Sequence, residues 1–184
     1  MSARISPAEP PYPQDIQGRL DKVMPSGVPP LTLFRMLARD TRLFERFMGG
    51  GLLDKGHLAL RQREIVIDRV TARCGSEYEW GVHIAFFGER VGFSPDQVRS
   101  LVHGSAEDAC WQDEAERVLI RVCDALHERA TIDEPLWTAF SGHFSDAACL
   151  EVFMLAGFYR TVSYLTNATA LPLEPYGARF PQAS

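Results

Sequence analysis

The sequence predicts an all-α protein, and three observations support this class. Apolar residues recur at helical spacing over most of the chain. No segment alternates apolar and polar residues over more than a few positions, and no hairpin signal joins two such runs. With 184 residues, the chain is long enough for one domain with a sizeable core. We therefore expect an extended proline-rich arm over residues 1–14 and a single helical domain over residues 15–184.

Charge and composition narrow the expected partners. The net charge of −5 gives no basic field for nucleic acid or for an anionic membrane surface. No apolar stretch reaches the roughly 18 residues of a membrane span, and the arm has no apolar core of the kind that a secretory signal needs. The sequence therefore predicts a cytoplasmic protein whose partner is a small molecule, with neither nucleic acid nor membrane involved.

The N-terminal helices follow from apolar spacing and from the residues that end them. A helix is expected over residues 15–24, ended by Pro25 and Gly27. A second is expected to start at Pro29-Pro30 and to continue to Met48, before the three glycines 49–51. A turn signal at residues 54–56 then leads to a helix that includes residues 63–74 and ends at Gly75.

The C-terminal half predicts further helices. One begins after Ser76 and is expected to continue to Val91, and a capping box at Ser94 and Gln97 opens the next, which extends to His103. Three more are expected over residues 113–129, 133–143 and 146–168, followed by an extended tail. The last helix is apolar on all sides at residues 152–158, which predicts a central buried element or the interface of a homo-oligomer.

Candidate catalytic residues gather around the break at Gly75. Ser76, Glu79 and His83 are spaced i, i+3 and i+7, so they project from one helix face. If the chain folds back at Gly75, Glu64 on the preceding helix reaches His83. We call Glu64, Glu79 and His83 the acid/base cluster, in which Glu64 orients the imidazole and the other two move protons.

Plainer interpretations stand beside this one. Glu79 and His83 also fit an ordinary intrahelical pair, and Ser76 fits a helix cap. Glu64 also fits an ion pair with a neighbouring arginine, and Arg63 and Asp68 are assigned to structural ion pairs. Two carboxylates and one imidazole are compatible with Mn, Fe or Zn, but no second histidine is suitably placed, so neither a metal nor a cofactor is expected.

Other polar residues are kept outside the catalytic set. Four in the last helix are expected to line a pocket or to complete the core, namely Tyr159, Arg160, Tyr164 and Asn167. The remaining histidines show no spacing relationship with the cluster, namely His57, His103, His127 and His143. The four cysteines form no Cys-x-x-Cys pair and are interpreted as structural, with Cys74 as a secondary candidate for chemistry.

Several motifs resemble one known family. They are Arg-Glu-Ile-Val-Ile (63–67), Gly-Ser-Glu-Tyr-Glu-Trp-Gly-Val-His (75–83), Gly-Phe-Ser-Pro-Asp-Gln-Val (92–98) and the ending from Asn167 to Pro175. They resemble the carboxymuconolactone decarboxylase family, within the superfamily that contains alkylhydroperoxidase D. The resemblance implies an alkylhydroperoxidase D-like helical bundle. Its redox members carry a Glu, a Cys-x-x-Cys pair and a His, at positions that correspond here to Glu64, Ser76, Glu79 and His83.

Both redox cysteines are therefore replaced here, and neither Ser nor Glu can cycle through a disulfide. The resemblance thus favours a lyase of the carboxymuconolactone decarboxylase type over a peroxidase. It implies cofactor-independent decarboxylation or isomerisation of a small organic acid or lactone. A binding or assembly protein without turnover is the first alternative, and a peroxidase that relies on Cys74 is the second.

Overall fold

The computed structural model describes residues 3–24 and 27–182, and it confirms the all-α class. Within these residues there are nine α-helices and one π-helix, with no strand. They are α1 (Gln14–Val23), α2 (Thr32–Leu37), α3 (Thr41–Gly50), α4 (Leu60–Arg73), α5 (Glu77–His83), η1 (Ile84–Gly88), α6 (Pro95–His103), α7 (Glu114–Arg129), α8 (Glu134–His143) and α9 (Asp146–Ala168). No helix in these two segments has the length and hydropathy needed to cross a membrane.

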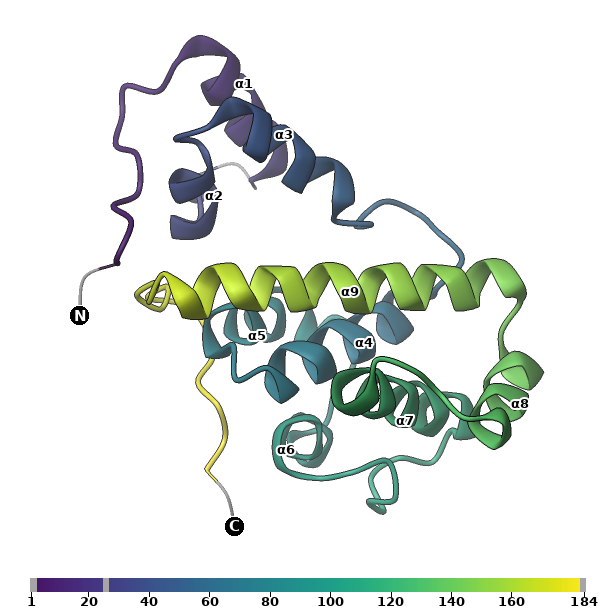
Figure 1. Ribbon diagram of the computed structural model, residues 1–184. Helices are drawn as coiled ribbons and strands as arrows, with labels where there is room; N and C mark the ends of the chain where they lie inside the picture. The colour runs from purple at the N-terminus through teal and green to yellow at the C-terminus, as the bar shows by residue number, and fades with distance from the viewer. Residues whose placement is uncertain (1–2, 25–26, 183–184) are drawn as a thin grey trace.

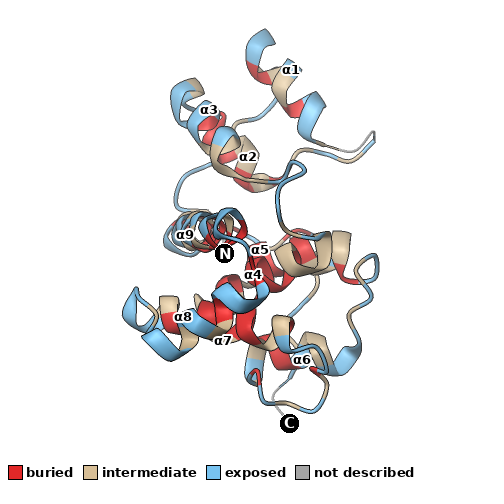
Figure 2. Cartoon of the chain, turned by 90° about the vertical axis from the view of Figure 1, so that its right-hand side faces the viewer, coloured by how far each residue is buried: buried red, intermediate tan, exposed pale blue. Residues whose placement is uncertain are grey.

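Helix α9 separates two groups of helices. It crosses the middle of the molecule, with α1 to α3 on one side and α4 to α8 on the other (Figure 1). Helix α4 is the most enclosed element, because α5, α6, α7 and α9 all pack against it. Its side chains from Glu64 to Thr71 are all buried, as the red ribbon of Figure 2 shows. Whatever chemistry the α4–α5 pair supports is therefore held by a rigid frame.

Helix α9 is central, as its apolar middle predicts, but it is not buried on all sides. Val152, Leu155 and Tyr159 are buried, whereas Leu150 and Met154 are each 63% exposed. The exposed side is compatible with the homo-oligomer expected from the sequence, which stays a prediction.

Two helix boundaries differ from the prediction. The helix expected from Pro30 to Met48 is divided into α2 and α3, because the Asp40 side chain accepts a hydrogen bond from the Leu43 amide (2.9 Å) and starts a new helix. The helix expected from Ser76 to Val91 changes to π geometry at Ile84, directly after His83. Such π segments are frequent at functional sites.

The other predicted starts agree closely. Ser94 and Gln97 form the capping box of α6, and Asp113, Asp133 and Ser145 cap α7, α8 and α9. Pro25, which was expected to end the first helix, lies outside the described residues.

The C-terminal tail holds α5 in place. The Ala178 amide donates to the Gly81 carbonyl oxygen (2.9 Å), and the rings of Trp80 and Phe180 lie 5.0 Å apart. A Cβ atom at Gly81 would lie 2.3 Å from the Ala178 oxygen, so only glycine permits this approach. The helix that carries Glu79 and His83 is thereby confined by the tail as well as by α4 and α9.

Candidate active site

The turn at Gly75 brings α4 and α5 together as the sequence predicts. Gly75 has a φ of +64°, a conformation that glycine adopts without strain. The chain reverses there, and Glu64 Oε2 lies 2.7 Å from His83 Nδ1. Both side chains are buried, with Glu64 fully enclosed. The predicted contact between Glu64 and the imidazole is therefore formed.

Glu64 also makes the ion pair given as its alternative. Its Oε1 accepts hydrogen bonds from Nε and Nη2 of Arg63, both at 3.1 Å. Arg63 is thus confirmed in its structural ion pair, and both oxygens of Glu64 have partners. Because Nδ1 is held by a carboxylate, the orientation of the ring is fixed and Nε2 is left for other partners.

Two groups meet at Nε2 of His83. The Tyr159 hydroxyl on α9 lies 3.1 Å away, and Glu79 Oε1 lies 3.5 Å away. The second oxygen of Glu79, Oε2, is buried and has no hydrogen-bond partner among the described residues. Tyr159 therefore extends the acid/base cluster, and Glu79 keeps one oxygen free.

The environment makes His83 an acid at neutral pH. Burial lowers its pKa, but the hydrogen bonds that its ring donates to Glu64 and Glu79, together with the charges of these carboxylates, raise it more, from the ordinary 6.5 to about 10. The imidazolium thus carries protons on both nitrogens. Burial also raises the pKa of Tyr159 well above its ordinary value, so this hydroxyl stays neutral.

A cavity of about 470 Å³, here called the site cavity, lies against this cluster. Its polar lining includes Glu79, His83, Tyr159 and Asp54, and no Lys or Arg is among the described residues that line it. The remaining wall is mainly apolar and comes from α1 to α3, the loop after α3, α5, η1 and α9; its large members are Met24, Leu31, Phe34, Phe47, Met48, Leu52, Leu53, Phe86, Phe87 and Phe158. The acid/base groups therefore face an apolar space.

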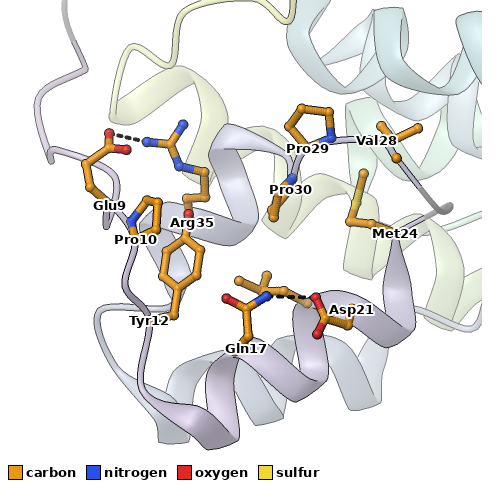
Figure 3. A pocket seen from close by; sticks show the side chains of 12 residues that line it. Glu9, Pro10, Tyr12, Gln17, Asp21, Met24, Val28, Pro29, Pro30 and Arg35 are labelled. Atoms are coloured by element: carbon orange, nitrogen blue, oxygen red, sulfur yellow. Dashed lines mark hydrogen bonds and ion pairs between the residues drawn. The ribbon is translucent and has the colours of Figure 1, made fainter.

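A second cavity, of about 680 Å³, lies between the N-terminal arm, α1 and α2 (Figure 3). Its polar side chains already pair with one another: Arg35 binds Glu9, and Gln17 donates to Asp21 at 2.7 Å. It contains no histidine or cysteine among its described lining. We therefore take the site cavity as the candidate functional site.

Ser76, the other secondary candidate, lies away from the site cavity. Its side chain is fully buried, its Oγ lies 2.8 Å from Thr166 Oγ1, and it is not among the residues that line the site cavity. It also makes no capping hydrogen bond, because its backbone (φ −88°, ψ 78°) is not in the extended conformation from which a serine caps a helix. Its hydroxyl joins α5 to α9.

Cys74 lies outside the site cavity as well. Its Sγ is 3.8 Å from Nδ1 of His127 on α7. Burial raises the pKa of the thiol, although Arg160 and Ser163 act in the opposite direction. Cys74 is thus a half-buried thiol whose pKa is raised, whereas an activated cysteine has a lowered pKa.

The last-helix candidates separate into two groups. Tyr159 lines the site cavity, whereas Arg160 binds the Tyr164 hydroxyl (2.8 Å) and the His127 carbonyl (3.0 Å). Asn167 donates to the Cys74 carbonyl oxygen at 2.9 Å. The sequence predicts Tyr159 as a pocket residue outside the catalytic set, because residue spacing carries no signal that its hydroxyl meets His83.

Asp68 does not form the ion pair that the sequence predicts for it. It is 1% exposed, and neither carboxyl oxygen has a partner among the described residues. Burial raises the pKa of Asp68 well above its ordinary value; the charge of His83 opposes this shift, and the charges of Glu64 and Glu79 reinforce it. Within the described ranges, no group of three or more His, Cys, Asp or Glu is arranged to hold a metal ion.

The fold and site define an all-α protein with a buried glutamate–histidine centre beside an apolar cavity. Residues 41–120 match the carboxymuconolactone decarboxylase family. This match confirms, over residues 41–120, the resemblance that the motifs suggest. A search of curated proteins gave no significant match.

Solved structures share the fold at low sequence identity. An uncharacterized peroxidase-related protein from Silicibacter sp. TM1040 has a TM-score of 0.83 at 19% identity, over 98% of this chain and 96% of the other. A peroxidase-related protein with an alkylhydroperoxidase AhpD core, from Ralstonia eutropha JMP134, has a TM-score of 0.76 at 16% identity, over 93% of each chain. The debrominase Bmp8 has a TM-score of 0.72 at 13% identity, over 94% of this chain and 92% of the other. At these identities the likeness establishes the fold.

Proposed function

We propose that this protein is a cofactor-independent acid/base enzyme that isomerises or decarboxylates a small organic molecule in the site cavity. One observation carries the proposal: the hydrogen-bonded chain from Glu64 through His83 to Tyr159 meets the Glu79 carboxylate at the wall of an apolar cavity. Buried titratable groups with strongly shifted pKa values, placed beside a cavity, are typical of catalytic sites.

Each residue has a separate role in this proposal. Glu79 is the base: it takes a proton from a substrate C–H or O–H bond, and the electron pair of that bond moves into the substrate's π system. His83 is the acid: it delivers its Nε2 proton to another atom of the substrate. The proton on Glu79 then returns to His83 across the 3.5 Å that separate them, which completes an isomerisation. In a decarboxylation, His83 protonates the carbon from which CO₂ has left.

Glu64 and Tyr159 support this transfer. Glu64 does not line the site cavity, so it acts as a positioning residue that fixes the ring and keeps His83 charged. When Nε2–H of His83 donates to the Tyr159 oxygen, the tyrosine proton is free to stabilise negative charge on a substrate oxygen.

Deuterium exchange tests the proposal with several classes of candidate substrate. Lactones, enols and small organic acids are incubated with the protein in D₂O, and loss of C–H signals is followed by NMR. We expect exchange with the wild type and a reduction of about 10²- to 10⁴-fold in His83→Ala. His127→Ala is the matched control and should exchange at the wild-type rate. Binding without exchange for any compound would favour the non-catalytic alternative.

A further inference from the structure

One carboxylate oxygen of Glu79, at the wall of the site cavity, accepts no hydrogen bond from the described residues. Its side chain is 8% exposed, and only Oε1 approaches another polar group, His83 Nε2 at 3.5 Å. Oε2 has no hydrogen-bond partner within the described part of the chain. A buried carboxylate oxygen without a donor is costly, so a ligand that supplies a donor gains from this position.

The charges around the site cavity disfavour an anion. Two acidic side chains line it, Asp54 and Glu79, and no Lys or Arg is found among the described lining residues. The positive charge of His83 is already shared by Glu64 and Glu79. Arg63 binds Glu64 and does not line the cavity. A substrate carboxylate would therefore meet the carboxylate of Glu79, and the one cation among the described lining residues, His83, is already paired with two glutamates.

The aromatic side chains in the wall of the site cavity favour a ligand that contains a flat ring. Phe86, Phe87 and Phe158 lie close to the acid/base groups, and the rings of His83 and Phe87 are 5.6 Å apart. A volume of about 470 Å³ lies within the range of about 300–1,000 Å³ that is usual for small-molecule sites. Flat apolar molecules gain most from such aromatic walls.

We propose that the site cavity binds an uncharged, mainly apolar ring compound that donates one O–H or N–H hydrogen bond to Glu79 Oε2. The inference rests on the proposed function, because it takes the site cavity as the substrate site. It also narrows the substrate: of the organic acids and lactones that the family resemblance implies, it selects uncharged molecules with a donor, such as enols or phenols. Free carboxylates are excluded, so of the two reactions proposed above this inference retains isomerisation and drops decarboxylation.

Three probes with one skeleton test this selection by isothermal titration calorimetry at neutral pH. 2-Naphthol is uncharged and has a donor, 2-methoxynaphthalene lacks the donor, and 2-naphthoate carries a negative charge. We expect the wild type to bind 2-naphthol about tenfold more tightly than 2-methoxynaphthalene, and 2-naphthoate more weakly than both. Tighter binding of 2-naphthoate, equal binding of the two neutral probes, or no binding of any probe would overturn the proposal.

Variants assign the preference to Glu79. In Glu79→Gln, the advantage of 2-naphthol should fall to about twofold, and 2-naphthoate should bind about tenfold more tightly than to the wild type. Glu89→Gln removes a carboxylate from an exposed position outside the site cavity and should change neither value. Because binding needs no turnover, a preference that persists while deuterium exchange fails would reject the acid/base function and retain this inference.

Discussion

Two histidines contact the α4–α5 region, and their surroundings shift their pKa values in opposite directions. His83 lies between the carboxylates of Glu64 and Glu79, which raise its pKa to about 10 against the effect of burial. For His127, burial lowers the pKa, and the charges of Arg160 and Arg73 lower it further. The first is therefore an imidazolium and the second a neutral ring at pH 7. The same residue type is a proton donor in one place and an inert contact of a thiol in the other.

The largest expected effect is a loss of stability when the carboxylate that pairs with His83 is removed. Glu64→Gln removes the charge that faces His83 and Arg63, and it leaves a buried imidazolium without its main partner. We expect the free energy of unfolding to fall by about 3 kcal/mol, as measured by urea denaturation. The control Glu128→Gln removes a carboxylate that pairs with Arg73 at the surface and should cost less than about 0.5 kcal/mol. Equal losses in the two variants would show that the His83 ion pair is not a special feature.

A smaller effect concerns the pH dependence of stability. The pKa of His83 is higher in the folded protein (about 10) than its ordinary value of 6.5, so the folded state binds this proton more tightly. This contribution is complete below about pH 6.5 and is lost as the pH rises towards 10. The free energy of unfolding should therefore decrease over this interval in the wild type and in His127→Ala. In Glu64→Gln the free energy of unfolding should decrease less steeply with pH. The same slope in this variant and in the wild type would contradict the assignment of the pH dependence to His83.

The smallest effect is expected at Cys74. Because burial raises the pKa of its thiol and its neighbour His127 is neutral, Cys74 should react with thiol reagents more slowly than free cysteine at pH 7. Cys74→Ser should leave any peroxide consumption at the wild-type level. Fast labelling of Cys74, together with peroxide consumption that Cys74→Ser abolishes, would restore the peroxidase alternative.

Local signals explain why much of the fold was predictable. Side chains that cap a helix within three residues, such as Ser94, Asp133 and Ser145, mark helix starts in the sequence itself. The contact between Glu64 and His83 also follows from local information, since the turn at Gly75 joins their helices. The helix start at Asp40 is hidden in the sequence, because apolar residues continue at helical spacing on both sides of it.

What the sequence could not reveal depends on contacts between distant segments. Tyr159 reaches His83 only because α9 packs across α5, and no spacing encodes that approach. Ser76 seemed suitably placed for the site until the backbone at the turn directed its hydroxyl to Thr166. The sequence predicts an ion pair for Asp68. The structure instead buries its carboxyl group, and neither oxygen has a partner among the described residues.

The protonation state of His83 is the central claim, and nitrogen NMR of the ¹⁵N-labelled imidazole rings tests it most directly. At about pH 8, between the ordinary and the shifted pKa, both ring nitrogens of His83 should carry protons, whereas His127 should show one unprotonated nitrogen. Glu64→Ala and His83→Ala spectra assign the signals. An unprotonated nitrogen on His83 at that pH would contradict the account, because the ring would then be a base and not the acid of the proposed reaction.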